Sequence, residues 1–188
     1  MAKTNTGAGA VKLVKPDAIV VTLFAGSETD DTPKGDTFVL DDVIRDTTSI
    51  AQDDNETNDI ERETSDTPIL SVVQAGKYQF AAEVADTQKD LLVALCDFTY
   101  DETTKKVFAP SAYKTKYAKI DVVFGTKAVV VPKLQLNSKV VMESLNTNIG
   151  KIALAGTAQL ASFKIGASGT QKTISTPYYI DENYTMPA

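Results

Sequence analysis

The sequence predicts a mainly β protein, a β-sandwich or barrel with one flanking α-helix and a long acidic loop or arm. Short β-branched segments recur along the 188 residues, separated by glycine, proline, asparagine and aspartate. Only residues 86–98 space their apolar side chains every three to four positions, as a helix does. The length fits a single domain, 1–188, with an N-terminal arm at 1–14, an acidic insertion at 28–66 and a C-terminal extension at 170–188.

The strands are predicted from runs of β-branched and aromatic residues. Residues 18–24 form a buried strand, because the run is short, apolar and bounded by Pro16 and Gly26. Residues 68–74 and 77–84 predict a hairpin that turns at Ala75-Gly76. Further strands are expected at 98–100, 106–108, 116–124, 127–132, 139–145, 151–160 and 163–165, the first two and the next two as hairpins.

The helix is expected to begin after Asp86 or Thr87, either of which is a good N-cap residue. Its apolar stripe is expected to lie against a sheet. The stripe consists of Leu91, Leu92, Ala94, Leu95 and Phe98.

Composition argues against catalysis. The chain has no histidine and no tryptophan, which removes the commonest general base and the commonest transition-metal ligand. Its one cysteine, Cys96, has apolar neighbours and is expected to be an inert buried thiol. The sequence contains no dinucleotide-binding, phosphate-binding or nucleophile-elbow motif. We therefore predict a protein that is not an enzyme and has no catalytic residue, cofactor or metal.

The charge is unevenly distributed. Residues 28–66 hold 14 acidic and 3 basic side chains, a local net charge of −11, although the whole chain carries only −6. Residues 103–172 hold 11 lysines and two acids, a local net charge of +9. Because opposite charges on different parts of one chain complement each other between copies, the pattern favours self-association.

The acidic insertion contains two strand-like pieces, 47–52 and 58–62, which are expected to pair across an arm. Calcium is a weaker explanation. An EF-hand loop that started at Asp53 would place Asn58 where glycine is needed and Thr64 where a bidentate glutamate is needed.

The order of these segments resembles that of the tail tube (major tail) proteins of long-tailed bacteriophages. The similarity spans about residues 15–165 and rests on three stretches. They are Asp46-Thr-Thr-Ser-Ile-Ala-Gln-Asp-Asp-Asn-Glu through Ile60-Glu-Arg-Glu, the run Phe80-Ala-Ala-Glu-Val-Ala-Asp86 leading into Asp90-Leu-Leu-Val-Ala-Leu95, and Lys151-Ile-Ala-Leu-Ala-Gly-Thr-Ala-Gln-Leu160.

The resemblance implies a virion subunit, assembled in the cytoplasm of a host bacterium, that forms hexameric rings stacked into a hollow tube. Its partners would be copies of itself and other tail proteins, with DNA passing through without specific binding and with no membrane involved. The long loop would connect one ring to the next. The candidate interface residues are Ile50, Asp53, Asp54, Glu56, Asp59, Ile60, Glu61 and Glu63.

Two other classes of function fit a self-associating or ligand-binding β domain. One is another virion component, such as a capsid-decoration or tail-terminator protein. The other is a ligand-binding module, suggested by three tyrosines in residues 170–188, a segment that either packs onto a neighbour or extends freely. A nucleic-acid surface at Tyr113 and Tyr117, which are interleaved with lysines, is weaker than an ordinary lysine-fringed hairpin.

Overall fold

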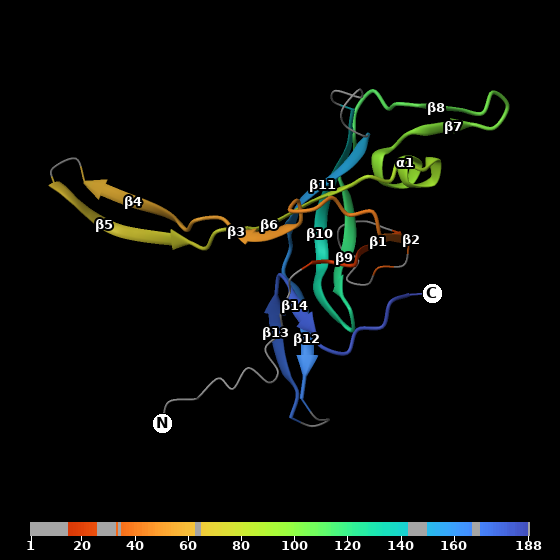
Figure 1. Ribbon diagram of the computed structural model, residues 1–188. Helices are drawn as coiled ribbons and strands as arrows, with labels where there is room; N and C mark the ends of the chain where they lie inside the picture. The colour runs from red at the N-terminus through yellow and green to blue at the C-terminus, as the bar shows by residue number, and fades with distance from the viewer. Residues whose placement is uncertain are drawn as a thin grey trace.

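The computed structural model describes residues 15–25, 33, 35–62, 65–142, 150–166 and 170–187, and for residues 58–62 and 65–72 it describes the backbone. In these ranges the chain is mainly β with one short helix, which confirms the predicted fold class (Figure 1). The expected N-terminal arm, residues 1–14, lies outside the described residues.

One antiparallel sheet forms the body of the molecule. Its hydrogen-bonded order is β2-β1-β9-β10-β11-β6-β3, and β14 also pairs with β10. The strands are β1 (Ala18–Leu23), β2 (Thr37–Leu40), β3 (Ser49–Gln52), β6 (Tyr78–Val84), β9 (Lys116–Phe124), β10 (Lys127–Val141), β11 (Lys151–Ala158) and β14 (Tyr179–Asp181).

Strand β10 is long, and it pairs with different strands along its length. Residues 128–130 pair with β14, whereas residues 134–141 pair with β11. Between these parts its register with β9 shifts at Val131/Leu134, around Pro132, a residue that cannot donate to a ladder. The predicted break between 127–132 and 139–145 was therefore wrong: the proline is accommodated in a bulge and the strand continues to Val141.

The sheet curls so that its two halves face each other in a sandwich-like arrangement. Ile50 of β3, at one end of the strand order, shares a cavity with Val122 of β9 and Val129 of β10. Side chains from both halves and from the helix form one core. Its fully buried large members include Phe80, Ile19, Leu40, Leu95, Ile120, Leu134, Leu136, Ile152 and Leu154.

Helix α1 (Lys89–Cys96) covers this core with Leu91, Leu92 and Leu95, as the apolar spacing predicted. It begins later than expected because the Asp86 carboxylate accepts a hydrogen bond from the backbone N–H of Gln88 at 3.0 Å, which stabilises a turn before the helix. It ends at Asp97, whose φ of 58° is left-handed.

Asp97 joins the end of the helix to the start of β9. Its Oδ1 lies 2.9 Å from Lys116 Nζ, and its Oδ2 accepts a hydrogen bond from the Lys114 backbone N–H at 2.8 Å. Desolvation opposes ionisation of Asp97, but hydrogen bonds and charge from Lys116 and Lys114 outweigh it and hold the pKa of the carboxyl below its usual value. The ionised form therefore stabilises the fold.

The C-terminal residues do not extend freely. Tyr184 donates its hydroxyl to Asp121 Oδ2 at 2.8 Å, and its backbone N–H donates to the Thr126 carbonyl at 2.8 Å. Asp121 is 2% exposed and also accepts from Lys119 Nζ at 2.8 Å. Burial, followed by contact with Asp121, raises the pKa of Tyr184, so the phenol remains a hydrogen-bond donor. This network stabilises the C-terminal segment against the outer face of β9.

Three two-stranded ribbons project from the body in different directions (Figure 1). They are β4 (Glu56–Arg62) with β5 (Ser65–Gln74), β7 (Thr99–Asp101) with β8 (Lys106–Phe108), and β12 (Ala161–Ile165) with β13 (Lys172–Thr176). The predicted hairpins 98–100/106–108 and 116–124/127–132 are confirmed.

The predicted hairpin between 68–74 and 77–84 was wrong. Strand β5 pairs with β4, and β6 pairs with β3 and β11, so no turn forms at Ala75-Gly76. Pairing across the arm between 47–52 and 58–62 was also wrong, because β3 and β4 follow each other along one side of it. Tertiary pairing has overridden the local turn preference of glycine.

Replacing Asp97 by asparagine is expected to lower the free energy of unfolding by about 1–3 kcal/mol at pH 7, since a hydrogen-bonded ion pair loses its charge. Because the folded pKa of Asp97 is depressed, its contribution is complete above the unfolded pKa of about 4 and is lost as the pH falls through the folded value. The difference from wild type, measured by denaturant unfolding, should therefore vanish in acid.

Glu102→Gln is the matched control for this variant, because Glu102 is exposed and its substitution removes the same charge. We expect this control to unfold like wild type at pH 7 and at pH 2. A full loss of stability in Asp97→Asn that persists at pH 2 would contradict the role assigned to the ionised carboxylate.

Candidate functional site

The acidic insertion predicted at 28–66 does not form one arm. Its segment β2 pairs with β1 in the sheet of the body, and the projecting arm is a hairpin in which β4 and β5 continue β3 and β6. Gln52 pairs with Tyr78 at the end of the β3-β6 ladder, and Glu56 pairs with Gln74 at the start of the β4-β5 ladder. Three residues lie between these positions on each strand, 53–55 and 75–77, so the register crosses the junction without a shift. The ribbon β4-β5 therefore continues β3-β6 outward, away from the body (Figure 1).

Backbone and side-chain hydrogen bonds bridge the junction where regular pairing stops. The Asp53 N–H donates to the Lys77 carbonyl at 2.9 Å, which extends the β3-β6 ladder by one bond. The Gly76 N–H donates to Asn55 Oδ1 at 3.0 Å, and Gln52 Nε2 donates to the Gly76 carbonyl at 3.1 Å. Polar groups that would otherwise be unpaired at the break thus have partners within the arm.

Gly76 is required at the junction because the opposite strand passes directly over it. A Cβ atom at this position would lie 1.7 Å from the Asp53 carbonyl oxygen and 2.9 Å from that of Asp54. Both are backbone atoms, so no side-chain movement relieves the overlap. Sequence analysis assigned Gly76 to a turn, yet the structure uses it for close approach of two strands.

Side chains at the root of the arm connect it to the body. Ile50 lies opposite Phe80 in the β3-β6 ladder, and Phe80 is fully buried in the core. Tyr78 contacts the Tyr178 ring edge-on, with centroids 5.4 Å apart. Gln79 accepts a hydrogen bond from Thr157 of β11 at 3.0 Å. The orientation of the root is therefore set by core packing and not by the arm alone.

The structure brings most of the predicted interface residues onto this one element. Ile50 lies on β3, and Asp53 and Asp54 lie in the junction, where Asp53 Oδ2 accepts a hydrogen bond from Gln79 Nε2 at 2.9 Å. Glu63 lies outside the described residues. The remaining predicted residues lie on β4: Glu56, Asp59, Ile60 and Glu61. Sequence analysis did not include Asn55 or Gly76 among the candidate interface residues, and it assigned the strand 68–74 to a different hairpin.

The arm is strongly acidic. Residues 53–74 contain seven carboxylates and one arginine, a net charge of −6. The side chains of Asp53, Asp54 and Glu56 are exposed. Crowding like charges on one ribbon is unfavourable, and a cationic partner surface would relieve that repulsion.

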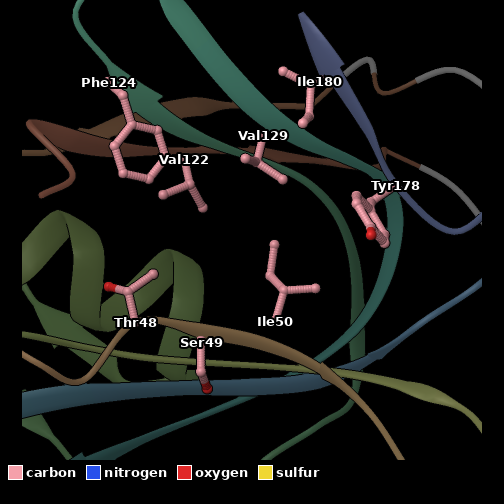
Figure 2. A pocket seen from close by; sticks show the side chains of 8 residues that line it. All are labelled: Thr48, Ser49, Ile50, Val122, Phe124, Val129, Tyr178 and Ile180. Atoms are coloured by element: carbon pink, nitrogen blue, oxygen red, sulfur yellow. The ribbon is translucent and has the colours of Figure 1, made fainter. Parts of the chain in front are cut away.

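An apolar cavity of about 310 Å³ lies beside the root of the arm (Figure 2). Figure 2 shows Ile50 on one side of it and Val122, Val129 and Ile180 on the other. The lining residues with polar side chains are Thr48, Ser49 and Tyr178, and no lining residue carries a carboxylate, amine or thiol. The cavity can accept apolar groups, but it offers no pair of groups for acid–base chemistry.

Within the described ranges, no three histidine, cysteine, aspartate or glutamate side chains come close enough to hold a metal ion. The same part of the chain contains no helix that is long and apolar enough to cross a membrane.

No protein-family model matches the chain, and no curated protein matches it. Among solved structures, the chain is similar to one in a cryo-EM structure of the anti-feeding prophage (AFP) baseplate, 6-fold symmetrised. The match covers 91% of this chain and 96% of the other, with 7% sequence identity and a TM-score of 0.36. A TM-score this low does not establish a common fold.

Gly76→Ala is expected to break the junction, because the new methyl group overlaps the backbone of Asp53. We expect faster amide hydrogen exchange throughout residues 53–77 and faster protease cleavage there, with the body unchanged. Ala75→Ser, at the exposed neighbouring position, is the control and should behave like wild type. Wild-type protection of the arm in Gly76→Ala would show that the close approach does not hold the junction.

Proposed function

We propose that this chain is a non-catalytic structural subunit of a bacteriophage tail, a tail tube protein that associates with copies of itself into rings and stacks of rings. The observation that carries the proposal is the projecting acidic hairpin, whose root is fixed in the core while its outer ribbon extends away from the body (Figure 1). The sequence resemblance to tail tube proteins supports the particular assembly.

The length of the ribbon suits a contact between molecules. The seven residues of β4, at about 3.3 Å each, extend about 23 Å beyond the junction. A two-stranded ribbon has little stability of its own in water. Packing against a neighbouring subunit would supply the apolar and backbone contacts that the ribbon lacks.

The distribution of charge supports a head-to-tail contact between identical subunits. The arm carries −6 over residues 53–74, while residues 103–172 carry +9. A contact between different surfaces of identical subunits closes into a ring or continues as a filament, and a stacked tube combines the two geometries. Partners in this proposal are other copies of the chain and other tail proteins, in a virion assembled in the bacterial cytoplasm.

The proposed role toward DNA is passage without binding. A tube wall with net negative charge repels a polyanion, so DNA would move along the lumen without adhering. The proposed assembly uses no cofactor or metal, because the association needs only attraction between charges, backbone pairing and apolar contact.

The arm can be removed without disturbing the body. Asp53 and Lys77 are already joined by a hydrogen bond, so replacing residues 54–76 with Asn-Gly closes the β3-β6 ladder as a two-residue hairpin. We expect the shortened protein to melt like wild type and to sediment as a monomer under conditions in which wild type forms large assemblies.

The matched control removes a different ribbon with the same turn. Thr99 pairs with Phe108, so replacing residues 100–107 with Asn-Gly shortens β7-β8 in the same manner. This variant should still assemble. Assembly of the armless protein at wild-type concentrations would contradict the function proposed for the arm.

A further inference from the structure

The ribbon β12-β13 has features that complement those of the arm. Like β4-β5, it is a separate two-stranded sheet, so its outer backbone edges are not paired within the sheets that the structure describes. It connects to the body through a ring contact between Phe163 and Tyr179 of β14, with centroids 5.4 Å apart. Unpaired edges of this kind accept another strand.

The ribbon is cationic. Residues 161–176 contain two lysines and no acidic residue, a net charge of +2. These lysines, Lys164 on β12 and Lys172 on β13, are both exposed. These lysines are positively charged, whereas residues 53–74 of the arm carry a net charge of −6.

Both ribbons also expose apolar side chains. Leu160, which precedes β12, is 70% exposed, and Ile165 at the end of β12 is 47% exposed. On the arm, Val73 of β5 is 61% exposed. Burial of these side chains against each other would add a hydrophobic contribution to the attraction between charges.

The third ribbon lacks this complementarity. Residues 99–108, which form β7-β8, carry two acids and two lysines, a net charge of zero. Glu102 and Lys105 pair with each other at 2.9 Å, and Asp101 accepts a hydrogen bond from Thr104 at 2.6 Å. Charges that have partners within their own ribbon gain less from a second molecule.

We propose that β12-β13 is the docking surface for the arm of a second copy of this chain, with an edge of one ribbon added to an edge of the other. The pairing is intermolecular because the two ribbons project from the body in different directions (Figure 1). This inference rests on the proposed self-assembly and specifies the surfaces that meet in it.

Charge exchange between two variants tests the pairing. The arm variant carries Asp54→Lys, Glu56→Lys, Asp59→Lys and Glu61→Lys, and the ribbon variant carries Lys164→Glu and Lys172→Glu. Each variant alone places like charges on both ribbons, so the concentration for half-maximal assembly should rise at least about tenfold. In an equimolar mixture each arm meets a ribbon of opposite charge, and assembly should return to within about threefold of wild type.

A double substitution on the neutral ribbon, Lys105→Glu with Lys106→Glu, makes the same charge change as the ribbon variant and should assemble like wild type. The proposed pairing of these two ribbons would be overturned if the wild type assembled but the equimolar mixture of the arm and ribbon variants did not. Failure of the wild type itself to assemble would instead contradict the proposed function.

A cross-linking experiment does not depend on charge reversal. The native Cys96 is fully buried, so we expect cross-links to form only between the engineered thiols. Desolvation, the dominant effect, raises the pKa of Cys96 to about 11, which further reduces its reactivity. Oxidising a mixture of Glu56→Cys and Lys164→Cys proteins should give a disulfide-linked heterodimer, and replacing Lys164→Cys by Lys105→Cys should give none. Equal yields in both mixtures would overturn the proposal.

Discussion

The unshifted register across the junction at Gly76 is the constraint on which the rest of the arm depends. The same residue-by-residue pairing continues from β3-β6 into β4-β5, although regular hydrogen bonding stops between them. The strands approach so closely that only glycine fits beneath the Asp53 carbonyl. As a result, an acidic segment is presented as a defined hairpin whose direction is set by Phe80 and the core beneath it.

The body and the ribbons divide the chain into regions with different physical roles. In the body, burial of apolar strand faces and of α1 supplies stability, and partly buried charged groups such as Lys116 and Asp97 pair with each other. The ribbons have little apolar contact with that core. Their net charge is negative for β4-β5, zero for β7-β8 and positive for β12-β13. Stability and association can therefore change independently, because substitutions on a ribbon leave the core intact.

The sequence predicted elements whose signals are local, such as the helix stripe at Leu91, Leu92 and Leu95, the strand 18–24 and the hairpin that turns at Gly125. It did not predict long-range pairing. The turn preference of Ala75-Gly76 concealed the continuation of β5 into β6, and Pro132 suggested a strand end where the chain forms a bulge. The acidic half of the arm was recognisable from its charge, whereas β5 has an ordinary apolar strand composition that carries no sign of projecting from the body.

We propose that this chain assembles with itself into rings and tubes. Electron microscopy of the purified full-length protein, across a range of protein and salt concentrations, tests it most directly. We expect rings or stacked tubes of constant diameter and axial repeat, with assembly weakened by high salt because opposite charges are screened. A strictly monomeric particle at every concentration and ionic strength would contradict the account.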